Sequence, residues 1–112
     1  MIFDLQQERK ELEERLMQEI EAYEKSGCQL AKNEAEYRKA LRVEILLERA
    51  NKTPVSIVSD ICRGKPEIAE LKLNRDCSEA VYSASKEAIH AIKLRLRILD
   101  EEITREWNSG GM

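Results

Sequence analysis

The first half of the chain repeats apolar residues at the spacing of a coiled coil. From Leu12 onward, the positions expected to face a partner helix, which we call the seam, follow one another three or four residues apart. They are Leu12, Leu16, Ile20, Tyr23, Gly27, Leu30, Glu34, Tyr37, Leu41 and Ile45. Such a repeat places one stripe of a helix against a partner helix. Because only Gly27 interrupts the run of helix formers, the pattern predicts one long helix over about residues 4–51.

The clearest break in the chain follows this helix. A short helix is predicted over about residues 54–63, with Thr53 as its N-cap and Pro54 at its first position. Gly64 is expected to end it in a left-handed conformation.

A second long helix is predicted over about residues 66–107, and residues 108–112 are predicted to be a disordered tail. The last part of this helix is apolar on two faces, since Ala91, Leu94 and Ile98 lie on a different face from the main row. A helix of this kind has more to bury than one partner helix covers. We therefore predict a homo-oligomer or protein-partner contact at Ile89, Ile92, Leu94, Leu96, Ile98, Leu99 and Ile103.

These elements predict an all-α fold, a single domain over residues 1–107. It is a long antiparallel two-helix coiled-coil hairpin with a short helix in the connector. Folding the chain about the connector 52–65 pairs residues whose numbers add up to roughly 117. Gly27 would then lie beside His90, and small residues of the first helix would face small residues of the second.

The composition agrees with a long-helix protein. Of 112 residues, 42% are hydrophobic and 37% are charged, with only 4 Gly and 2 Pro. No stretch approaches the apolar length of a membrane span, so no membrane contact is expected. The cysteines Cys28, Cys62 and Cys77 are odd in number and lack CxxC spacing, so we expect three reduced thiols in a cytoplasmic protein.

Charge is distributed unevenly along the sequence. Residues 1–25 hold 4 basic and 8 acidic side chains, whereas residues 38–75 hold 9 basic and 5 acidic ones. Residues 38–75 form the turn end of the predicted hairpin, the basic hairpin tip. Its cations could neutralise several phosphates, with nucleic-acid contacts at Arg63, Lys65, Lys72 and Arg75. The net charge of −3 argues against a dedicated nucleic-acid binder, so a solvated tip is the favoured interpretation.

The sequence predicts no catalytic, cofactor-binding or metal-binding residues. His90 is the only histidine, and its helical neighbours Lys86, Lys93 and Arg97 are cations, which repel a metal ion. Neither Cys28 nor Cys77 belongs to a recognisable catalytic arrangement. The glutamates of the first helix are expected to form a solvated face.

Several segments carry a resemblance. They are residues 53–64 (TPVSIVSDICRG), 71–76 (LKLNRD), 80–82 (AVY), 37–41 (YRKAL) and the stretch from Ile92 to Trp107. Together, over residues 37–107, they resemble small uncharacterised helical proteins of phages and prophages in Gram-positive bacteria. The resemblance implies a bacterial, phage-related cytosolic setting, where such genes commonly lie among replication and recombination functions. It implies no catalytic residues.

Two functions follow as expectations. The first is a non-enzymatic, self-associating coiled-coil protein that acts as a protein-interaction or structural module. The alternative is an accessory nucleic-acid-binding protein of phage replication or recombination that uses the basic hairpin tip. An enzyme is the least expected, because a two-helix hairpin offers a pocket only at an oligomer interface.

Overall fold

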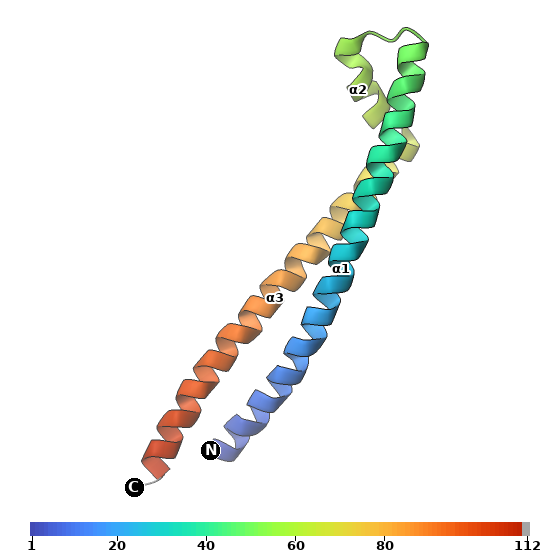
Figure 1. Cartoon of the computed structure of the whole chain (residues 1–112). Helices are drawn as coiled ribbons and strands as arrows, with labels where there is room; N and C mark the ends of the chain where they lie inside the picture. The colour runs from blue at the N-terminus through green and yellow to red at the C-terminus, as the bar shows by residue number, and fades with distance from the viewer. Residues whose placement is uncertain (111–112) are drawn as a thin grey trace. The chain divides into compact units, whose positions relative to one another are not determined.

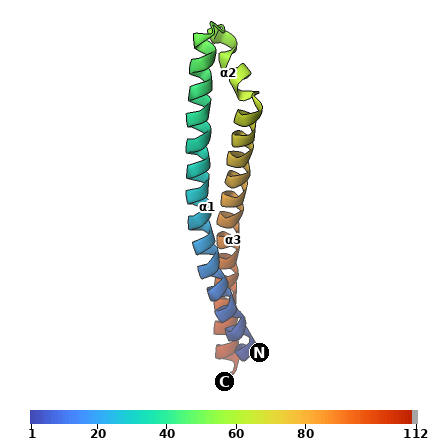
Figure 2. The same ribbon diagram turned by 90° about the vertical axis from the view of Figure 1, so that its right-hand side faces the viewer.

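The computed structural model describes residues 1–110, and the fold is all-α (Figure 1). Helix α1 spans Ile2–Ala50, the short α2 spans Val55–Arg63, and α3 spans Pro66–Gly110. The two long helices pack against each other in antiparallel directions, and α2 lies in the connector between them (Figures 1 and 2). The predicted hairpin and its three helices are thus confirmed.

The second long helix ends later than the sequence predicted. Helix α3 continues beyond Trp107 to Gly110. Asn108 and Ser109 have lower helix propensity than alanine, but neither breaks a helix. The last two residues of the predicted tail, 111–112, lie outside the described residues.

The helices form two compact units, and each unit contains a stretch of both long helices. The terminal unit consists of Met1–Lys25 and the segment that starts at Ser83. The connector unit is Ser26–Tyr82 and contains α2. The domain expected over residues 1–107 is therefore built from two parts.

The coiled-coil seam of α1 is confirmed, because every seam position predicted from Leu12 to Ile45 is buried or half-buried. Helix α3 carries a matching row at alternating steps of three and four: Ile68, Leu71, Arg75, Ser78, Tyr82, Ser85, Ile89, Ile92, Leu96, Leu99 and Ile103. All of these side chains are also buried or half-buried. Both helices therefore present one stripe to each other, as the seven-residue repeat requires.

The terminal unit has an apolar core. Leu12 of α1 packs with Ile92 and Leu99 of α3, and Leu99 is fully buried. Three partly buried leucines, Leu5, Leu16 and Leu96, pack around this cluster. The interior of this unit consists of the large aliphatic residues that the sequence pattern indicated.

The chain reverses direction immediately after α1. Lys52 has a left-handed backbone with φ of 65°, and its N–H donates to the Arg49 carbonyl at 3.0 Å. The Thr53 N–H donates to the Glu48 carbonyl, also at 3.0 Å. These two bonds form a Schellman motif, which ends a helix by satisfying its last carbonyl groups.

Two details of the connector differ from the sequence prediction. Pro54, not Thr53, precedes the first helical residue of α2, and no side chain caps this helix. The Thr53 hydroxyl donates to Glu48 Oε2 at 2.7 Å instead. Gly64 is right-handed, with φ of −82°, so its backbone turns only slightly between α2 and α3.

The predicted pairing of residues was wrong by about two helical turns. The numbers of facing residues add up to 109 for Gly27 with Tyr82, Glu34 with Arg75, and Glu44 with Lys65. The prediction placed the reversal in the middle of residues 52–65. In the structure α2 already runs back beside α1 (Figure 2), so the reversal lies four residues earlier and each sum is eight lower.

Candidate functional site

The residues predicted to contact a partner divide into two groups. Ile89, Ile92, Leu96, Leu99 and Ile103 belong to the inner row of α3 and are buried or half-buried within the chain. Leu94 and Ile98 are exposed, at 53% and 38%. Of the seven predicted contact residues, Leu94 and Ile98 are the two whose side chains α1 does not cover.

The outer face of α3 in the terminal unit carries these two aliphatic residues among small side chains and the exposed charges of Glu87, Arg97 and Glu101. Ala84 and Ala91 are also exposed and lie on the same side of the helix, at steps of seven residues from Ile98. Leu94 lies one helical turn from both Ala91 and Ile98. The face therefore presents small residues beside two large aliphatic ones.

Four basic residues of the predicted tip, Arg38, Lys65, Lys72 and Arg75, form ion pairs within the connector unit. Lys65 Nζ lies 2.7 Å from Glu44 Oε2 and 2.7 Å from Glu48 Oε1. All three side chains are less than one-third exposed. The hydrogen bonds that Lys65 donates to Glu44 and Glu48 raise the pKa of Lys65, so this cation is held by its own chain.

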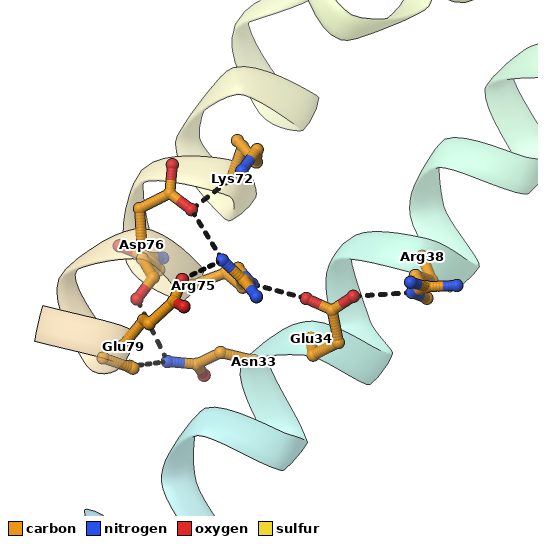
Figure 3. A network of polar contacts seen from close by, with 9 residues as sticks. Asn33, Glu34, Arg38, Lys72, Arg75, Asp76 and Glu79 are labelled. Atoms are coloured by element: carbon orange, nitrogen blue, oxygen red, sulfur yellow. Dashed lines mark hydrogen bonds and ion pairs between the residues drawn. The ribbon is translucent and has the colours of Figure 1, made fainter. Parts of the chain in front are cut away.

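Arg75 lies at the centre of a second polar group (Figure 3). Its Nε donates to Glu34 of α1 at 2.6 Å, and its Nη1 contacts Asp76 and Glu79 on its own helix. Glu34 also accepts from Arg38 at 2.6 Å, so it lies between two guanidinium groups. The hydrogen bonds that Arg75 donates, above all the one to Glu34, raise the pKa of Arg75.

A neutral polar contact lies next to the Glu34–Arg75 pair, between Asn33 of α1 and Ser78, which is one turn along α3 from Arg75. Asn33 Nδ2 donates to Ser78 Oγ at 2.5 Å and to the Asn74 carbonyl at 3.4 Å. Together with Glu34 and Arg75, it makes a polar layer between α1 and α3 where the terminal unit has leucine and isoleucine.

Two of the four predicted nucleic-acid contacts meet at a shallow groove. Arg63, Lys72, Tyr37 and Ala69 line this groove, whose volume is about 570 Å³. Lys72 Nζ lies 5.9 Å from the centre of the Tyr37 ring and also binds Asp76 at 2.8 Å. Arg63 is exposed at the end of α2. The structure thus brings Arg63 and Lys72 together and directs Lys65 and Arg75 to carboxylates.

Three carboxylates of the connector unit have pKa values below their ordinary range. Hydrogen bonds from Arg38, followed by those from Arg75, lower the pKa of Glu34. Lys65 and then Thr53 do the same for Glu48, and Lys72 and then Arg75 for Asp76. All three remain ionised at neutral pH and keep their cations in place.

The sequence prediction did not place Glu44 and Glu48 in the seam between the helices. The steps of three and four that lead to Leu41 continue to Glu44 and then to Glu48, and both are half-buried. Following the apolar residues to Ile45 obscured this continuation. A strict seven-residue count would have identified both glutamates as partners for a cation of the returning chain.

The other candidate groups lie apart from these contacts. Cys62 is fully buried, whereas Cys28 and Cys77 are exposed. His90 is exposed, and the ring beside Gly27 is that of Tyr82, 3.1 Å from where a Cβ would stand. Within residues 1–110, no three His, Cys, Asp or Glu side chains gather as metal ligands would. None of the helices described is both long and apolar enough to span a membrane.

Comparison with known proteins gave no match for this chain, whether to family models, curated proteins or solved structures.

Proposed function

We propose that this chain is a non-enzymatic, self-associating coiled-coil protein that acts as a protein-interaction or structural module in the cytoplasm. The observation that carries the proposal is the exposed apolar face of α3, where Leu94 and Ile98 remain open. Its opposite face is already filled by the core around Leu99. A helix that is apolar on two sides favours a second helical neighbour.

The partner in this proposal is a second copy of the chain. Ala84 and Ala91 would let the backbone of another helix approach closely, while Leu94 and Ile98 would supply most of the buried apolar area. Leu94 and Ile98 are already partly covered, so burying the rest of each side chain contributes less than the roughly 1.5–3 kcal/mol of a fully exposed one.

Light scattering coupled to size-exclusion chromatography tests this proposal. At tens of micromolar we expect a mass at least twice the 13.0 kDa of one chain. The double substitution Leu94→Glu/Ile98→Glu should give the monomer, because it places charges on the buried face. Met17→Glu is the matched control, since Met17 is 66% exposed on α1 of the same unit.

Two results would contradict self-association through this face. One is a monomeric parent protein at tens of micromolar. The other is an oligomer that survives Leu94→Glu/Ile98→Glu while circular dichroism shows an unchanged helix content.

The groove at Arg63 and Lys72 supports a second candidate, an accessory nucleic-acid-binding protein of phage replication or recombination. Two cations that line one groove are groups that contact the phosphates of a single strand. The resemblance to phage proteins adds to this candidate. The ion pairs of Lys65, Lys72 and Arg75 oppose it, because they occupy three of the four predicted contacts.

Binding to a labelled single-stranded oligonucleotide at low salt separates the two candidates. A nucleic-acid binder should lose affinity on Arg63→Gln/Lys72→Gln and keep it on Lys86→Gln/Lys93→Gln, which removes the same charge from the terminal unit. Affinity should also fall as salt rises. If the parent protein does not bind at low salt, this candidate is excluded.

A further inference from the structure

One carboxylate holds both ends of the connector helix. Glu48 Oε2 accepts from the Thr53 hydroxyl, just before α2, at 2.7 Å. Glu48 Oε1 accepts from Lys65 Nζ, just after α2, at 2.7 Å. The Glu48 side chain is only 19% exposed. Both bonds therefore converge on a single partly covered group of α1.

Two further polar bonds hold the ends of α2: Lys65 Nζ donates to Glu44 Oε2 at 2.7 Å, and Arg49 Nη1 donates to the Thr53 carbonyl at 2.9 Å. Its buried residues are Val58 and Cys62, while Val55, Ile57 and Ile61 are 67%, 45% and 41% exposed. The helix has 9 residues, which is too short to be stable by itself in water. Its docking thus combines two apolar side chains with these polar bonds, and Glu48 is bound on both sides of α2.

The chain on either side of α2 interrupts helical hydrogen bonding. Pro54 precedes it and Pro66 follows it, and neither has an N–H to donate. Helix α1 has already ended at Ala50 with its own terminal bonds, and α3 begins at Pro66. The nine-residue helix can consequently move without unwinding its neighbours.

We propose that Glu48 is a latch that keeps α2 docked on α1, and that α2 opens locally to expose Cys62 while the rest of the hairpin stays folded. Local opening of segments with few buried contacts is a general property of folded chains. The latch is independent of self-association, because Glu48 and α2 lie in the connector unit and the apolar face of α3 lies in the terminal unit.

The thiol of Cys62 reports this opening directly. In a Cys28→Ser/Cys77→Ser background, Cys62 is the only thiol, and its reaction with a disulfide reagent requires exposure. We expect Glu48→Ala to raise the reaction rate at least tenfold. Glu44→Ala is the matched control: it also removes a carboxylate from Lys65 but leaves the Thr53 bond intact, so its increase should be less than threefold.

The Cys28→Ser/Cys77→Ser protein with Glu48 intact gives a second test that does not depend on how the Glu48 and Glu44 variants fold. If α2 opens locally, the Cys62 rate should stay nearly constant at low urea, because local opening exposes little surface. If the rate instead rises with the full urea dependence of global unfolding, the thiol is exposed only by unfolding and the latch is refuted. Equal rates for Glu48→Ala and Glu44→Ala would also refute it.

Discussion

The terminal unit and the connector unit share one seven-residue spacing and fill it with different chemistry. In the terminal unit, Leu12 meets Ile92 and Leu99. In the connector unit, Glu34 meets Arg75, and the pair Glu44 and Glu48 meets Lys65. Apolar layers supply the larger share of stability, because ion pairs lose much of their attraction to desolvation.

The polar layers instead fix the alignment of the two helices along each other. If α3 slipped by seven residues along α1, leucine would still meet leucine or isoleucine in an apolar seam. In the connector unit the same slip would set Arg75 against Gly27 or Leu41 and leave Glu34 without its partner on the other helix. Because an unpaired, partly buried charge is costly, we infer that these layers select one register.

The largest expected effect is in the apolar core. Leu99→Ala should lower the free energy of unfolding by about 2–5 kcal/mol, because this fully buried side chain would leave a cavity. Urea denaturation followed by circular dichroism measures it. Leu73→Ala, at an exposed position of the same helix outside the proposed oligomer contact, should change stability by no more than about 0.5 kcal/mol. Equal losses would contradict the assignment of inner and outer faces.

Acid should weaken the connector unit in particular. Ion pairs lower the pKa values of Glu34, Glu48 and Asp76, so the unfolded chain takes up protons at a higher pH than the folded one. The contribution of these ion pairs to the free energy of unfolding is fully present above pH 4.5, the ordinary pKa of a glutamate. It is lost as the pH falls through the lowered pKa values. Amide exchange at a series of acidic pH values should show protection lost first in the connector unit. Earlier loss in the terminal unit would contradict this difference.

A smaller effect is expected from a single polar contact. Arg75→Met leaves Glu34 without a cation from α3 while Arg38 remains, so stability should fall moderately. The urea midpoint should decrease by less than it does for Leu99→Ala. Lys86→Met, at an exposed position of α3, should leave the midpoint unchanged. In molar salt the effect of Arg75→Met should shrink, because salt screens exposed pairs.

The smallest expected effect is a gain in stability at the reversal. Lys52→Gly removes the cost of a left-handed backbone at φ of 65° and should stabilise the chain by about 1 kcal/mol or less. Lys39→Gly is the opposite control, because it places glycine inside α1 and should cost about 1 kcal/mol. A loss of stability for both variants would argue against the Schellman motif.

The seam and helix boundaries were predictable because they depend on local spacing and on proline. Leu12, Tyr37 and Leu99 could be placed on the inner stripe from their spacing alone. The register could not, because it depends on where the chain reverses. That point is set by the left-handed Lys52, a residue type without a special preference for this conformation.

The candidate surfaces were only partly predictable for a related reason. Spacing identified Leu94 and Ile98 as members of a second row, but Ile89 and Leu99 were assigned to the same contact although they face α1. The basic tip was visible as a count of charges. Its neutralisation by Glu34, Glu44 and Glu48 depends on pairs far apart in sequence, which composition does not reveal.

The shared spacing of the two helices also determines how the chain can change in length. Deleting seven residues from α1 alone would move every later side chain one heptad out of step with α3. Matched deletion of residues 28–34 and 75–81 would instead remove complete layers and leave the pairs on both sides, such as Tyr37 with Lys72 and Gly27 with Tyr82, facing as before. Each such step would shorten both helices by about 10 Å, so insertions and deletions are tolerated as paired units rather than as single events.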